Sequence, residues 1–157
     1  MNEKNIVENL FVECEKHKKM VQWAINLLKS NKFYPFTSEI LISLNEKDIS
    51  LIDTLTFRFS KLQETLGKIF WQLILLMGEN TEELTFLDVL HKMEKYKIIN
   101  EASEWQEFRR IRNTITHDYE TNYDLLSENL NLFFDKIQVF LSYYENAKNF
   151  YKTKLEG

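Results

Sequence analysis

Apolar residues recur at alternating spacings of four and three along most of the chain, the spacing of one face of an α-helix. The clearest run predicts a long helix over residues 47–77, ended by Gly78. Its stripe consists of Leu55, Phe59, Leu62, Leu66, Ile69, Leu73 and Leu76. The second half of this helix carries apolar residues on its other faces as well, so we expect this half to be buried nearly all round: Phe70, Trp71, Ile74 and Leu75.

Further helices are predicted on both sides of the central one. Thr85 with Asp88, and Ser103 with Gln106, have the spacing of capping boxes at helix starts. The predicted helices cover residues 6–28, 39–44, 85–96, a segment that begins at Ser103, and 122–152, with a loop over 31–38. Together these elements predict an all-α fold, an antiparallel four- to five-helix bundle that forms one domain over residues 1–157.

The amino-acid composition agrees with long helices and favours a cytoplasmic location. The 157 residues include three glycines and one proline, too few turn formers for a fold of many short strands. One cysteine, Cys14, excludes a disulfide within the chain, as in proteins of a reducing cytosol. The polar N-terminus resembles no signal peptide, and no apolar run reaches the ~20 residues of a membrane span. We therefore expect a cytoplasmic protein without membrane contact.

The arginines are concentrated at one point of an acidic chain. The net charge is −4, which argues against broad, charge-driven binding of nucleic acid. Only four arginines occur, yet Arg109, Arg110 and Arg112 fall within four residues. The planar guanidinium grips phosphate oxygens in pairs, so this grouping predicts a local anion site.

The arginine cluster leads into a segment with the residues for acid–base chemistry. His117 can accept or donate a proton near neutral pH, Arg112 can stabilise charge on phosphoryl oxygens, and Asn113 can orient either partner. This inventory suits RNA phosphodiester cleavage without a metal or cofactor. Arg112 precedes His117 by five residues, about 140° around a regular helix. Either the helix deforms near His117, or a second copy supplies the complementary group, as in a twofold dimer.

The string Arg112-Asn113-x-x-x-His117-x-Tyr119, preceded by Trp105-x-x-Phe108-Arg109, resembles the HEPN superfamily, in particular the HepT-like toxins of type VII toxin–antitoxin systems. The resemblance implies a homodimeric endoribonuclease with Arg112 and His117 as catalytic residues. Asn113, Arg109 and Thr116 would support them. It also implies a partner, a minimal nucleotidyltransferase antitoxin that attaches AMP to Tyr119 and so prevents RNA from entering the cleft.

Two other functions fit the same residues. The chain could be a non-enzymatic nucleotidyltransferase substrate-binding subunit, or a helical protein-interaction module, because an Arg-x-x-x-x-His spacing also occurs by chance on solvated helices.

Other groups have simpler interpretations. Cys14 and His17 could form half a metal site, but their place on an apolar stripe favours a packed thiol and a core histidine. His91 and Glu94 are expected to form an exposed pair. The last helix carries aromatic residues beyond its main stripe, which predicts a docking face for a partner or a second protomer: Phe134, Tyr143 and Phe150.

Overall fold

The computed structural model describes residues 2–118 and 121–156. This part of the chain contains six α-helices and no strand, which confirms the predicted all-α bundle. A π-helical turn at Tyr151–Leu155 follows the last of them. In chain order the helices are α1 (Glu3–Ser30), α2 (Ser38–Ser43), α3 (Glu46–Leu76), α4 (Phe86–Lys95), α5 (Ala102–Asp118) and α6 (Tyr123–Phe150).

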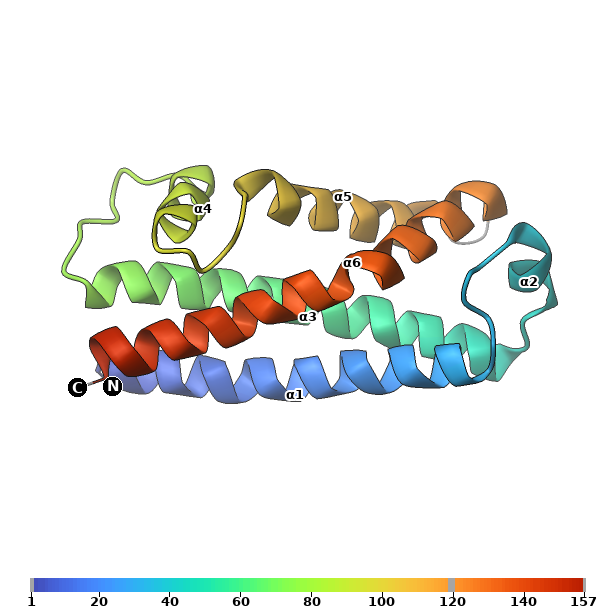
Figure 1. Cartoon of the computed structure of the whole chain (residues 1–157), viewed down its shortest axis with the longest axis horizontal. Coiled ribbons are helices and arrows are strands. Elements are labelled where there is room, and N and C mark those ends of the chain that lie inside the picture. Colours follow the sequence, from blue (N-terminus) through green and yellow to red (C-terminus); the bar gives the residue numbers. More distant parts are fainter. Residues whose placement is uncertain (1, 119–120, 157) are drawn as a thin grey trace.

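The long helices lie along one axis, as Figure 1 shows. Helices α1 and α3 are antiparallel neighbours, α6 crosses them, and α5 lies beside the N-terminal half of α6. The short α4 lies over the C-terminal end of α3 and leads into α5. The two ends of the described chain meet, since the Lys4 ammonium donates to the Glu156 backbone carbonyl at 3.1 Å. Helices α3, α4 and α5 contact one another and together form one side of the molecule.

Most helix starts are fixed by side chains that accept a hydrogen bond from a backbone N–H three residues further on. Asn2, Thr37, Asn45, Thr85 and Asn122 all do so. The capping box predicted at Thr85 is confirmed, with both of its hydrogen bonds formed by Asp88. Gly78, just after α3, has a φ of 79°, so the predicted left-handed stop is also confirmed.

The capping box predicted at Ser103 is wrong. Helix α5 begins at Ala102, so Ser103 already lies inside it, and its hydroxyl donates to the Glu101 carboxylate. The amide of Ala102 donates instead to Glu94 of α4 at 2.9 Å. A carboxylate from a neighbouring helix therefore caps the start of α5, the role that the local sequence predicted for Ser103.

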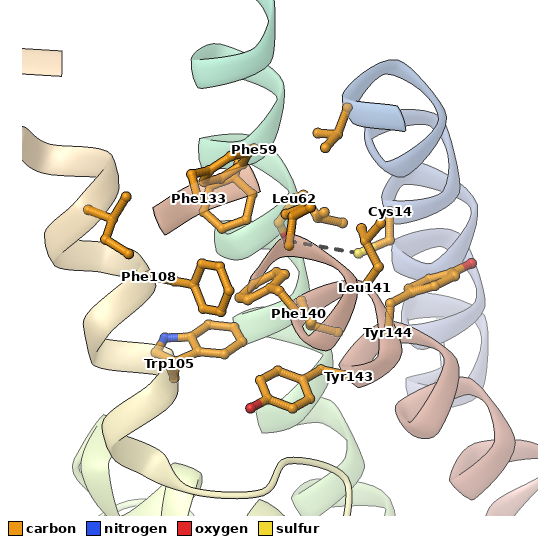
Figure 2. Packing of buried hydrophobic residues seen from close by; sticks show 14 of the residues in the cluster. Cys14, Phe59, Leu62, Trp105, Phe108, Phe133, Phe140, Leu141, Tyr143 and Tyr144 are labelled. Carbon is orange, nitrogen blue, oxygen red and sulfur yellow. Dashed lines mark hydrogen bonds between the residues drawn. The ribbon is translucent and has the colours of Figure 1, made fainter. Parts of the chain in front are cut away.

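An aromatic cluster holds α3, α5 and α6 together (Figure 2). The Phe140 ring lies 4.8 Å from Phe59, 5.1 Å from Phe108 and 5.2 Å from Trp105, measured between ring centroids. All four side chains are almost completely buried. Tilted and edge-on ring pairs at these distances add about 0.5–1.5 kcal/mol each beyond the burial of apolar area. This cluster fixes the position of α5, which carries the arginines and His117.

The predicted docking face on α6 is also wrong, because its aromatic residues are used inside the bundle. Phe134 is covered by the segment between α1 and α2, where Tyr34 stacks on it at 5.3 Å. Tyr143 is buried and its hydroxyl donates to Glu104 of α5. Phe150 packs against Tyr96 at 5.3 Å. These rings have partners within the chain.

The second half of α3 is less buried than its composition suggests. Trp71, Gln72 and Leu75 keep part of their surface exposed, because only α1, α4, α5 and α6 surround α3 and one side stays open. No helix of the described part is long and apolar enough to cross a membrane. The open side of α3 is where the candidate site lies.

Candidate functional site

Helix α5 presents the candidate residues on a regular α-helical scaffold. Its inner side is fixed by the buried side chains of Trp105, Phe108, Ile111 and Ile115. The helix continues without a break to Asp118, so spacing along the sequence converts directly into direction around the axis. Of the two geometries that the sequence left open, a deformed helix is therefore excluded within one chain.

Arg112 is partly buried and is held by two amide oxygens. Its guanidinium donates to Gln63 Oε1 at 3.3 Å and to Asn113 Oδ1 at 3.1 Å. Gln63 is itself buried in α3, and its amide donates to the Trp105 carbonyl at 3.2 Å. Because both ends of Gln63 are engaged, the arginine is oriented before any ligand arrives. Of the two partners that Asn113 was expected to orient, the structure places its side-chain oxygen on Arg112.

The electrostatic setting of Arg112 favours an anion. Burial lowers the pKa of its guanidinium from 12.5, and the nearby positive charge of Arg109 lowers it further, while Glu64 acts in the opposite direction. The group stays charged at neutral pH, since arginine does not deprotonate in proteins. A cation that has lost part of its hydration and stands beside another cation is stabilised when a phosphate or carboxylate binds.

None of the arginines is neutralised by a carboxylate among the side chains that the structure describes. Arg58 contacts His17 at 3.2 Å, and Arg110 donates to Asn129 of α6 at 3.4 Å. The ion pairs of these side chains all use lysine or histidine as the cation. Arg109 is exposed beside Arg112. In an acidic protein, unneutralised arginines at one point mark an anion site.

Arg109 and Arg112 line an open groove of about 340 Å³ between α3, α4 and α5. The spacing of Trp105, Arg109 and Arg112 places these three on one face of α5. Glu64, Lys68 and Trp71 occupy the facing stripe of α3. The remaining lining residues are Gln63, Gly67 and, from α4, Phe86. We call this space the arginine groove.

A second groove of about 310 Å³ lies further along α3 and α5. It is lined by Phe57, which is 57% exposed, and by Ile115 and Thr116 among others. A small cavity of about 10 Å³ beneath Arg112 and Ile115 is lined mainly by core residues. The side of the molecule between α3 and α5 is thus hollowed along much of the length of α5.

His117 does not line the arginine groove. It is exposed in the last turn of α5, about 140° from Arg112 around the axis. Asn113 is exposed as well, and the Thr116 hydroxyl donates to the Arg112 carbonyl at 2.9 Å. The structure therefore brings Arg112, Asn113 and Arg109 together and leaves His117 apart. Tyr119, expected to carry AMP, lies outside the described residues.

Searches of family models, curated proteins and solved structures found no match to this chain. The residues that sequence reasoning missed are Gln63, Lys68 and Trp71 of α3. One signal was available for Gln63, because an amide that interrupts an apolar region usually binds another buried polar group.

The other candidate groups are structural. Cys14 is buried in α1 with its Sγ 4.0 Å from the Leu62 carbonyl, and burial raises the pKa of the thiol, so it is a poor nucleophile and a poor metal ligand. His17 Nδ1 accepts from Arg58, and its Nε2 lies 3.6 Å from Glu13. His91 pairs with Glu94 at 2.6 Å on the exposed side of α4, as predicted.

Proposed function

We propose that this protein is a metal-independent endoribonuclease that works as a homodimer. The observation that supports the proposal best is the Arg112 guanidinium, oriented by Gln63 and Asn113, unpaired with any described carboxylate, and facing a groove beside Arg109. RNA supplies the phosphate that such a group binds, and the cytoplasm is the compartment where this substrate would be met.

The proposed reaction is attack of the RNA 2′-hydroxyl on the adjacent phosphorus. His117 removes the 2′-hydroxyl proton as the new P–O bond forms, and the bond to the 5′-oxygen breaks. The leaving oxygen takes up a proton, and the products are a 2′,3′-cyclic phosphate and a 5′-hydroxyl. Arg112 stabilises the negative charge that grows on the phosphoryl oxygens. Asn113, Arg109 and Thr116 support this geometry.

The direction of the side chains supports a dimer. Arg112 and His117 of one regular helix point about 140° apart, so one chain does not place both on the same phosphate. A twofold axis beside α5 would bring Arg112 of one protomer to His117 of the other, and it would create two equivalent sites. A partner nucleotidyltransferase that adds AMP to Tyr119 would attach a bulky anion two residues after His117 in the sequence and so exclude RNA.

The first experiment is RNA cleavage by the purified protein in EDTA. Arg112→Ala and His117→Ala are expected to lose activity, while each keeps wild-type helicity. The matched controls are Arg110→Ala, the same change on another face of α5, and His91→Ala, an exposed histidine of α4. Equal losses in the controls, or cleavage that survives both site substitutions, would reject the assignment.

The second experiment tests the shared site. Mixing inactive Arg112→Ala and inactive His117→Ala proteins under subunit exchange is expected to restore about a quarter of wild-type activity, because about half of the dimers are mixed and each contains one intact site. A mixture that stays inactive, although mass spectrometry of the native complexes shows exchange, would contradict a site formed by two chains.

A second candidate function is a non-enzymatic nucleotidyltransferase substrate-binding subunit. It is favoured by the composition of the arginine groove, whose lining contains cations and aromatic rings but no histidine. It predicts tight complex formation with a nucleotidyltransferase and no cleavage of RNA by unmodified protein. Intact mass after co-expression with such a partner would show whether Tyr119 carries AMP under either function.

A further inference from the structure

Two tryptophans line the arginine groove, and they differ in how much of the ring is buried. Trp105, at its floor, is 3% exposed and packs against Phe70, Phe86 and Phe140, so it is structural. Trp71 differs, because it keeps part of its surface exposed and has no ring partner within the described residues. An indole that lines a groove without a stacking partner offers its face to a planar ligand.

Positive charges lie close to the Trp71 indole in this groove. Lys68 lies three residues before Trp71 in α3, and Arg109 and Arg112 line the groove from α5. One carboxylate, Glu64, also lines it, but Lys61 and Lys68 flank that group at 3.7 Å each. Aromatic faces interleaved with cations are the chemistry of single-stranded nucleic-acid sites, where bases stack and phosphates are bound by arginine and lysine.

The dimensions of the groove also fit one nucleotide. Its volume of about 340 Å³ lies at the lower end of the range of small-molecule sites, about 300–1,000 Å³. Gly67 lies buried at its floor, where an added Cβ would contact the Phe86 ring at 3.4 Å and Trp105 at 3.8 Å. A second groove lies further along the same two helices, at Ile115 and Thr116 of α5.

We propose that the arginine groove binds one unpaired nucleotide of a single-stranded RNA, with the base stacked on Trp71 and a flanking phosphate on Arg109 and Arg112. The identity of the strand rests on the proposed nuclease function. The consequence is specificity for unpaired RNA, because a base stacked inside a duplex cannot reach Trp71. Trp71 is then a specificity-determining residue, separate from the acid–base chemistry of His117.

The test measures binding without cleavage. A fluorescent 2′-O-methyl RNA hexamer has no free 2′-hydroxyl, so its affinity, read by fluorescence anisotropy, is independent of nuclease activity. Trp71→Leu keeps an apolar side chain and removes the aromatic face, and it is expected to weaken binding roughly tenfold. Trp71→Phe restores a ring and is expected to stay within about threefold of the wild type. The control is Trp23→Leu on α1, where the indole is 47% exposed and far from the groove in sequence.

Spectroscopy and competitors make the test specific. In a Trp23→Phe background the hexamer is expected to quench tryptophan fluorescence, and Trp71→Leu is expected to abolish this. A duplex of the same sequence should compete poorly. Equal affinity of Trp71→Leu and wild type, or equal binding of the duplex, would overturn the proposal, and AMP that competes as well as the hexamer would show a mononucleotide site instead. Cleavage and binding are separate readouts, so the two proposals fail separately. Wild type that binds the hexamer without cleaving RNA would reject only the nuclease function, and cleavage together with equal affinity of Trp71→Leu and wild type would reject only this proposal.

Discussion

Replacing Gly67 with alanine is expected to stabilise the protein, although the residue is buried at the floor of the groove. Gly67 lies inside α3, a helix of 31 residues, and has ordinary helical surroundings. Glycine inside a helix costs about 1 kcal/mol relative to alanine, because the unfolded chain loses more freedom when it folds.

The contacts around Gly67 set the size of the effect. An added Cβ would lie 3.4 Å from two atoms of the Phe86 ring and 3.8 Å from Trp105, which are van der Waals contacts without a clash. The gain in helix propensity should therefore be kept nearly whole, about 0.5–1 kcal/mol. For a domain of this size that corresponds to a rise in Tm of about 2–4 °C per kcal/mol.

Gly78→Ala is the matched control, with the opposite sign expected. No atom lies within 4 Å of the added Cβ at Gly78, but φ there is +79°. A residue with a Cβ pays about 1–2 kcal/mol in this left-handed region. The same chemical change is thus expected to stabilise the protein at position 67 and to destabilise it at position 78, because the backbone conformation differs.

Urea denaturation followed by far-UV circular dichroism measures both variants. The midpoint should rise for Gly67→Ala and fall for Gly78→Ala, with unchanged slopes. Destabilisation of Gly67→Ala by about 1 kcal/mol or more would refute the reasoning, since it would mean that Phe86 of α4 cannot yield and that overpacking outweighs propensity.

Two further predictions concern the core and the link between α4 and α5. Phe59→Ala is expected to cost about 3–5 kcal/mol in urea denaturation, and Phe57→Ala, two residues away and 57% exposed, about 0.5 kcal/mol or less. Glu94 has a pKa below its usual 4.5 because His91 and the Ala102 amide hydrogen-bond to it, so its stabilisation is present above the unfolded pKa and is lost as pH falls through the folded one. The stability difference between wild type and Glu94→Gln should therefore be largest above about pH 5 and shrink in acid; a constant difference would contradict this.

Features that depend on neighbours in sequence were predictable. The stripe of α3, the capping box at Thr85 and the stop at Gly78 all depend on residues within a few positions of one another, and helical periodicity and backbone conformation act over that range. The prediction of a capping box at Ser103 was wrong because Glu94, which accepts the hydrogen bond from the first amide of α5, belongs to another helix. The prediction of a docking face on α6 was wrong for the same reason, since Tyr34 covers Phe134 from a segment about 100 residues earlier in the chain.

The candidate site also has features that the sequence predicted and features that only the tertiary structure decided. The sequence determined that Arg112 and His117 point about 140° apart, because direction around an α-helix follows from spacing alone. Only the tertiary structure decided that Gln63 and Trp71 of α3 face the arginines that line the groove. That meeting depends on how aromatic side chains from α3, α5 and α6 fill a common core, a sum of contacts between distant segments that no local pattern contains.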